Sequence, residues 1–307
     1  MLGRDRIQYK TVDQMLLMRR AGLVVADALD AVQAALRPGV STRELDAIAH
    51  GVIRSAGATP SFLNYGHPPY PATTCISVND EVVHGIPGGR VLAAGDVVSV
   101  DCGAILAGWH GDAAFTAIVA GGPANPATGP ATNPATGPAT NPATEPAMDP
   151  STAAAGSRSD RDLVEITRQS MWHGIAAIAA GQRLNAIGAA IESLVAGRYG
   201  LVEEYGGHGI GTEMHQDPHV LNYRTRDQGR KMRPGLCLAI EPMLTAGGPD
   251  TRVLPDHWTV ATVDGSRSAH WEHSVALHDG GLWVLTARDG GEAGLASVGV
   301  RAAPLAD

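Results

Sequence analysis

Two aspartates flank a turn signal within β-prone sequence. Asp101 lies in "VVSVDCGAIL", and Asp112 follows "GWHG" directly before "AAFTAIVA". Two such runs around a turn signal predict a hairpin, across which the two carboxylates would face each other. Acids inside apolar sequence repel each other unless a cation lies between them. The pair therefore favours a metal site, and the alternative is two solvated acids at a strand edge.

Another candidate ligand, His208, lies in "YGGHGIGTEMHQDPHV". Glycines surround His208, and glycine allows the backbone to approach a ligand closely. A zinc-binding pair of His215 and His219 is rejected, because Pro218 breaks the helix that such a pair needs and the glutamate of a His-Glu-x-x-His motif is absent. A lone histidine is more often a satisfied core or surface residue than a ligand, so the glycines are what favour His208.

Two glutamates complete the set. Glu241 ends the apolar run "LCLAIEP", where it is poorly placed for solvent, and Glu272 lies in the alternating stretch "SAHWEHSVAL". Either could be an edge residue on its own. With Asp101, Asp112 and His208 they make four carboxylates and one imidazole, a mixture that suits two hard or borderline divalent ions.

His84 closes the stretch "CISVNDEVVHGIP", just before a Gly85-Ile86-Pro87 turn. By itself this position fits either a packing residue or a residue that handles substrate. Which of the two applies depends on what else in the chain shares a site with it.

Composition excludes several classes of protein. The 307 residues suffice for a sizeable core, and a formal net charge of −8 without a basic cluster argues against nucleic acid. No apolar run reaches membrane-spanning length, and the charged start shows no signal peptide. Three widely spaced cysteines indicate free thiols in a reducing compartment, so we expect a cytoplasmic protein with small or peptidic partners.

A low-complexity repeat interrupts the chain. "NPATGPAT" at 125–132 recurs at 133–140, and "NPATEPAM" follows at 141–148. Proline at this density prevents a helix or a sheet ladder, so 123–158 is expected to be an extended insertion loop. We interpret it as a tolerated surface insertion, and the alternative is a segment that docks a partner such as the ribosome.

The sequence on the two sides of this insertion is similar in layout. Residues 19–57 and 165–200 each predict two helices with apolar residues at three- and four-residue spacing. Gly39 and Gly181 occupy equivalent positions, and strand-like runs at 96–106, 113–120, 236–246 and 274–287 follow the helices. Helices followed by strands, twice over, predict a pseudo-symmetric α+β domain with a cleft between its halves.

Five motifs in this order resemble type I methionine aminopeptidases from about residue 8 to residue 287. They are "CISVNDEVVHGIP", "VDCGAILAGWHGD", "GGHGIGTEMHQDP", "IEPM" and "SAHWEHSV". The resemblance implies the pita-bread fold as a single catalytic domain over 8–287. The tail beyond it, at 288–307, is expected to be unstructured. It also implies removal of the initiator methionine from new polypeptides when the second residue is small.

The resemblance implies a role for each ligand. Asp101 is expected to be a terminal carboxylate on one metal, with Asp112 and Glu272 bridging the two ions. His208 and Glu241 are expected to bind the other metal. A water or hydroxide between two divalent ions (Co²⁺, Mn²⁺, Fe²⁺ or Zn²⁺) would then attack the scissile carbonyl, with Glu241 managing its proton.

Substrate contacts follow from the same resemblance. His215 is expected to hydrogen-bond the scissile carbonyl, and His84 to contact the peptide nitrogen and assist protonation of the leaving group. The residues expected in the methionine pocket are Cys75, Met214, Trp258 and Tyr70. Either Tyr65 or His67 could join them, because "NYGHPPYP" does not align without gaps. Gly103 replaces a hydroxyl residue that many relatives place near the substrate amine.

Rival members of the fold fit less well. Prolidases and aminopeptidase P have an extra N-terminal domain before the first aspartate, and type II enzymes have a helical insertion between the two glutamates. Neither feature is present in this sequence. A pita-bread protein that binds partners without catalysis is the rival from another class, and intact ligands argue against it. The expected protein is a monomer whose partners are peptides and, transiently, the ribosome.

Overall fold

The computed structural model of the chain describes residues 7–121, 150–179, 181–195 and 197–305. The repeat at 125–148 lies outside the described residues. Within them, no helix combines the length and the apolar character that crossing a membrane requires. The helices are α1 (Val12–Ala35), α2 (Thr42–Ser55), α3 (Pro150–Ala176), α4 (Asn185–Val195) and α5 (Glu292–Ser297).

The first two helices begin at reciprocal caps. The Thr11 hydroxyl accepts from the Gln14 amide and the Gln14 side chain accepts from the Thr11 amide, while Ser41 and Glu44 repeat this arrangement at α2. Each cap satisfies backbone donors that have no partner inside the helix, which is typically worth about 1 kcal/mol. The predicted helix pair in the first half is confirmed.

The expected equivalence of Gly39 and Gly181 is visible in the backbone. Their φ angles are +87° and +86°, in the left-handed region that favours glycine. The amide of Gly39 donates to the carbonyl of Leu92 at 2.9 Å, and the amide of Gly181 donates to the carbonyl of Met232 at the same distance. The two halves therefore turn from their first helix into their second in the same way.

A large curved sheet joins the halves. Its main path is β1-β4-β5-β14-β9-β7-β8, with β2 paired to β4 and β15 to β14. Its strands are β1 (Thr59–Pro60), β2 (Thr74–Val78), β4 (Val97–Leu106), β5 (Trp109–Ile118), β7 (Gly207–Gly209), β8 (Gln216–Val220), β9 (Leu236–Ile240), β14 (Glu272–His278) and β15 (Gly281–Val284). The pairing of β5 with β14 connects the first half to the second.

Two three-stranded sheets flank the large one. One has the order β13-β10-β6 and the other β11-β12-β3. Their strands are β6 (Gly200–Leu201), β10 (Met243–Thr245) and β13 (Ser268–His270), then β3 (Glu81–Val83), β11 (Thr251–Val253) and β12 (Val260–Thr262).

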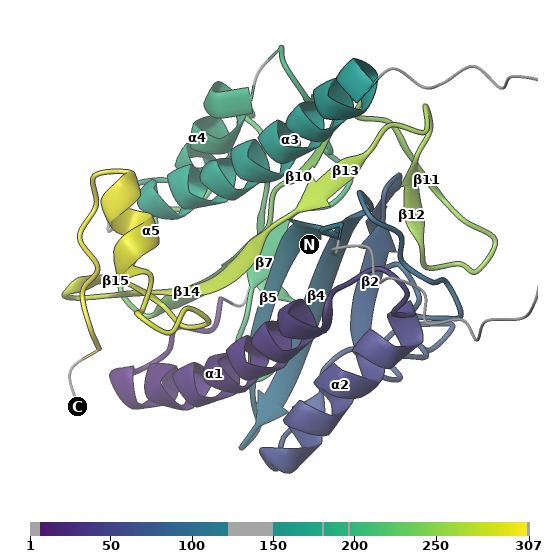
Figure 1. Cartoon of the computed structure of the whole chain (residues 1–307). Helices are drawn as coiled ribbons and strands as arrows, with labels where there is room; N and C mark the ends of the chain where they lie inside the picture. Colours follow the sequence, from purple (N-terminus) through teal and green to yellow (C-terminus); the bar gives the residue numbers. More distant parts are fainter. Residues whose placement is uncertain (1–6, 122–149, 180, 196, 306–307) are drawn as a thin grey trace, which may run out of the picture.

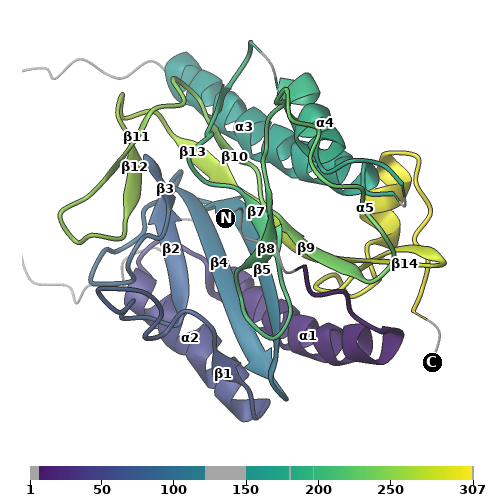
Figure 2. The same cartoon turned by 180° about the vertical axis from the view of Figure 1, so that it is seen from behind.

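The helices cover one face of the large sheet. They lie in front of the strands in Figure 1 and behind them in Figure 2. Val100 and Cys102 of β4 pack against α1 and α2 in one apolar cluster, and Leu238 and Ile240 of β9 pack against α3 and α4 in another. Because side chains alternate along a strand, the residues between them, such as Asp101, point to the opposite face.

Two predicted boundaries are wrong. Helix α3 begins at Pro150, so the insertion predicted as a loop over 123–158 ends earlier than expected. The predicted unstructured tail at 288–307 instead contains α5, whose Leu295 is fully buried beside Trp172. Leu305 packs with Met15 of α1. The tail is ordered because these leucines cover apolar surface of α3 and α1.

Candidate metal centre and substrate cleft

Strand register places several predicted site residues in one row. Cys75 of β2 is opposite Asp101 of β4, Asp101 is opposite Ala114 of β5, and Ala114 is opposite Glu272 of β14. Directly opposed residues share a face of the sheet, so all of these side chains point away from the helices. The row crosses the junction of the two halves.

Asp112 joins this row as a diagonal neighbour. It is opposite Gly103, which lies two residues after Asp101 on the same face of β4. The predicted hairpin of β4 and β5 is therefore confirmed, with its turn at Ala107 and Gly108. The expectation that the aspartates face each other directly is wrong by one diagonal step, because the two-residue turn at Ala107 and Gly108 pairs Asp101 with Ala114.

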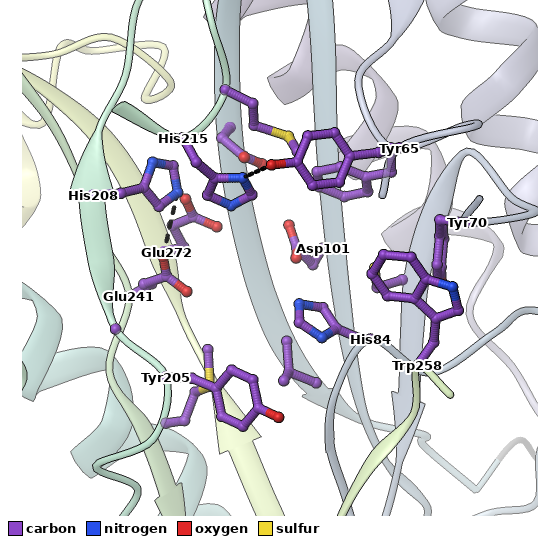
Figure 3. Close-up of a pocket in the computed structure, with 17 residues that line it drawn as sticks. Tyr65, Tyr70, His84, Asp101, Tyr205, His208, His215, Glu241, Trp258 and Glu272 are labelled. Atoms are coloured by element: carbon purple, nitrogen blue, oxygen red, sulfur yellow. Dashed lines mark hydrogen bonds and ion pairs between the residues drawn. The ribbon is translucent and has the colours of Figure 1, made fainter. Parts of the chain in front are cut away.

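The second half contributes His208 and Glu241. His208 of β7 is opposite Ala239 of β9, and Glu241 follows Ala239 by two residues, which returns it to the same face. His208 Nε2 lies 3.4 Å from Glu241 Oε1. Figure 3 shows both side chains pointing towards Asp101, which lies in the first half of the fold.

The donor set fits divalent cations. Ligand atoms of Asp112, His208 and Glu272 lie within 4.8 Å of one another. One carboxylate oxygen each of Asp101, Asp112 and Glu272 is buried without a hydrogen-bond partner. Among the described residues that line the cleft, none is lysine or arginine. Buried carboxylates that no basic side chain compensates are stable as anions only beside a cation, so these residues are suited to hold one or more metal ions.

Burial dominates the electrostatics of these side chains. Burial, and then the charges of neighbouring acids, raise the pKa values of Asp101, Glu241 and Glu272 well above their ordinary range. Burial likewise raises the pKa of Asp112 to about 7. Burial lowers the pKa of His208 to about 3, so its imidazole is neutral and able to bind a metal.

The cleft contains every side chain predicted for the metals and the substrate. It has a volume of about 720 Å³ including its open mouth. The predicted residues that line it are Tyr70, Cys75, His84, Asp101, Asp112, His208, Met214, His215, Glu241, Trp258 and Glu272. Their individual roles stay predictions. Of the two open candidates, Tyr65 lines the cleft, and the exposed His67 is not among its lining residues.

His84 enters the cleft through an unusual backbone conformation. Its φ of +59° is uncommon for a residue with a side chain, and such positions cluster at functional sites. The His84 ring lies edge-on to the rings of Tyr205 and Trp258, with distances between ring centroids of 5.7 Å and 6.0 Å. Burial, and then His215, lower the pKa of His84 to about 4, so the ring is neutral near pH 7.

Some residues of the site had no prediction. Phe62, Val83, Tyr205 and Met243 also line the cleft. His270 is buried, with Nε2 3.8 Å from Glu241 Oε2. Strand alternation could have identified His270, because it precedes Glu272 by two residues. No local signal marks Phe62 or Tyr205.

Gly103 is explained by close packing. A β-carbon at this position would lie 2.8 Å from Ser61 Cβ and 2.9 Å from Phe62 Cε1, both below normal contact distance. The Ser61 hydroxyl, 3.1 Å from the same point, forms a 3.0 Å hydrogen bond with His110 Nδ1. Ser61 and Phe62 therefore fill the space that a hydroxyl-bearing side chain at residue 103 would need.

This fold and site define a metallopeptidase. The chain belongs to metallopeptidase family M24, whose pattern matches residues 16–132 and 150–279. Methionine aminopeptidase 1 of Mycobacterium tuberculosis is 46% identical over 292 residues, which cover 92% of this chain and 96% of that protein. Methionine aminopeptidase 1 of Bacillus subtilis is 38% identical over 280 residues, covering 90% and 98%.

Solved structures agree with this assignment. The crystal structure of methionine aminopeptidase from Rickettsia prowazekii superposes with a TM-score of 0.78 at 31% identity, covering 92% of this chain and all of that one. The resemblance to type I methionine aminopeptidases and the predicted pita-bread fold are both confirmed.

Proposed function

We propose that this chain is a methionine aminopeptidase that removes the initiator methionine from polypeptides whose second residue is small. The observation that carries the proposal is that a cluster of buried carboxylates and an apolar wall lie side by side in one cleft. The buried row of carboxylates meets an apolar wall formed by Phe62, Tyr70, Cys75, Met214 and Trp258. An apolar wall with aromatic and sulfur-containing side chains suits a flexible thioether.

We infer that two divalent ions bind, because the five donors exceed the protein ligands that one catalytic ion usually takes. Asp101, Asp112 and Glu272 would hold one ion. His208 and Glu241 would hold the second ion, together with Asp112 and Glu272. Such ions lower the pKa of water and polarise a carbonyl group. The mixture of carboxylates and one imidazole is compatible with Co²⁺, Mn²⁺, Fe²⁺ or Zn²⁺.

The remaining residues orient the peptide and move protons. Glu241 would accept the proton of the attacking water at a carboxylate oxygen. His215 would donate a hydrogen bond to the scissile carbonyl oxygen as negative charge develops there. His84 would contact the peptide nitrogen and assist protonation of the leaving amine. Since the imidazole of His84 is neutral near pH 7, it does not repel a positively charged peptide N-terminus.

The test is cleavage of Met-Ala-Ser and Met-Lys-Ser by purified protein, with chelator and with added Co²⁺ or Mn²⁺. Metal-dependent release of methionine from the first peptide alone would support both the reaction and the rule of a small second residue. Release that persists after exhaustive chelation would contradict a metal-dependent mechanism. No release with any metal would favour a protein that binds partners without catalysis.

The cellular context stays a prediction. A cytoplasmic location rests on the three cysteines, which are all free and buried. Ribosome contact rests on the repeat, which lies outside the described residues. Deleting 125–148 tests it: peptidase activity should be retained, and only a loss of ribosome cosedimentation would give the repeat a docking role.

A further inference from the structure

Two histidines of the cleft have different hydrogen-bond partners, and the partner determines which ring nitrogen carries the proton. His208 Nδ1 lies 3.0 Å from the carbonyl oxygen of Gly209. A carbonyl only accepts, so Nδ1 of His208 must carry the hydrogen and Nε2 keeps its lone pair. That lone pair faces the carboxylates, as a metal ligand requires.

His215 has the opposite kind of partner. Its Nδ1 lies 2.7 Å from the phenol oxygen of Tyr65. Burial, and then the charge of Glu213, raise the pKa of the Tyr65 phenol, so the phenol keeps its proton near neutral pH. A neutral imidazole carries a single N–H, on either Nδ1 or Nε2. When the phenol donates to Nδ1, this hydrogen must be on Nε2.

We propose that Tyr65 is a positioning residue, which holds His215 as the Nε2–H tautomer and aims that N–H at the oxygen of the scissile carbonyl. The inference rests on the proposed function and adds a residue to it. An imidazole whose Nδ1 carried the hydrogen would present a lone pair to the developing oxyanion and repel it. Figure 3 shows the Tyr65 phenol reaching His215 from the half of the cleft opposite β7.

The loop around Tyr65 is built to keep the phenol in place. The amide of Tyr65 donates to the carbonyl of Phe62 at 2.9 Å, and the amide of Tyr70 donates to the carbonyl of Tyr65 at 2.8 Å. Trp258 Nε1 donates to the carbonyl of Pro68 at 3.0 Å, which ties the loop to the second half of the fold. Tyr65 itself is 42% exposed, so these backbone hydrogen bonds, more than side-chain packing, fix its position.

The variant that tests the proposal is Tyr65→Phe, which keeps the ring in the cleft and removes only the hydroxyl. On Met-Ala-Ser, kcat should fall about 10- to 100-fold, the usual scale for removing a hydrogen bond that orients a functional side chain, with KM within about twofold. In a His215→Ala background the same change should have no further effect on kcat. Tyr9→Phe is the matched control, because Tyr9 is also 42% exposed and should leave kcat unchanged.

A readout independent of activity is the ¹⁵N NMR signal of the His215 ring in the diamagnetic Zn²⁺-loaded protein, assigned by its loss in His215→Ala. In the parent, Nε2 should carry the hydrogen and Nδ1 should show the shift of a hydrogen-bonded acceptor. Tyr65→Phe should move the Nδ1 signal towards that of an unbonded nitrogen and populate the Nδ1–H form. An unchanged ring spectrum, or an unchanged kcat, overturns the proposal.

The two readouts separate the inference from the proposed function. If the parent cleaves no peptide, the proposed function fails, and the NMR comparison still decides whether Tyr65 sets the tautomer of His215. If the parent cleaves Met-Ala-Ser and the ring spectrum of Tyr65→Phe equals that of the parent, only the assignment of Tyr65 fails.

Discussion

Replacing Asp112 with asparagine tests the electrostatic description of the metal centre without reference to catalysis. Asp112 is 3% exposed, and burial raises its pKa to about 7 in the ion-free fold, from an ordinary value of 3.8. The unfolded chain therefore loses this proton at a lower pH than the folded chain. Between about pH 4 and pH 7 the folded state binds more protons, so Asp112 makes the ion-free protein less stable as pH rises.

The magnitude follows from the difference between the two pKa values. An ordinary value of 3.8 and a folded value of about 7 correspond to about 4 kcal/mol, since each unit is worth about 1.4 kcal/mol. The asparagine side chain of the variant has no proton to lose. The free energy of unfolding of Asp112→Asn, relative to the parent, should therefore increase by up to about 4 kcal/mol between pH 4 and pH 7.

The assay is urea unfolding of chelator-treated protein at several pH values between 4 and 7.5. Asp13→Asn removes a negative charge from an exposed position in α1 and is the matched control. Adding Mn²⁺ should reverse the trend for the parent, because metal binding requires ionised carboxylates, and should have little effect on Asp112→Asn. A difference between parent and variant that is constant from pH 4 to pH 7 would refute the assignment of Asp112 as a buried acid of raised pKa.

Three further changes test other parts of the structure. His215→Ala should retain metal, measured by elemental analysis, and lose about 10²- to 10³-fold in turnover, the scale of one oxyanion donor; kinetics equal to the parent's would remove His215 from the mechanism. Gly103→Ala should raise KM for Met-Ala-Ser, because the new β-carbon presses on Phe62 in the cleft wall. It should also lower the free energy of unfolding by about 1–3 kcal/mol. An unchanged KM would show that Phe62 keeps its position in the cleft wall. Leu295→Ala should lower the free energy of unfolding by about 2–5 kcal/mol with kcat unchanged, because Leu295 is fully buried in the apolar cluster with α3 and α4. A loss below about 0.5 kcal/mol would show that the tail contributes little to the core.

Much of the fold could be predicted because its signals are local. Apolar spacing predicted both helix pairs, and alternation and turn residues predicted the hairpin of β4 and β5. Polar residues in apolar strands are equally local, which is why Asp101 and Glu241 were predicted as ligands. The hairpin turn was misplaced by a short distance, since its position depends on strand pairing as well as on glycine content.

The tail shows the limit of local signals. The segment 288–305 is short and rich in glycine and alanine, which is typical of unstructured termini. Their order comes from contacts with α1 and α3, elements that lie far away in the sequence. Neither Leu295 nor Leu305 has a pattern around it that predicts these contacts.

The sequence alone determined which side chains could bind metal and which elements carry them, because ligand chemistry and strand periodicity are properties of residues and their neighbours. Only the tertiary structure decided how they meet. Pairing of β5 with β14 places Glu272 beside the aspartates, and the contact of Tyr65 with His215 joins residues 150 positions apart. The physical reason is that distant segments meet through collective packing of the whole chain, which no local stretch of residues encodes.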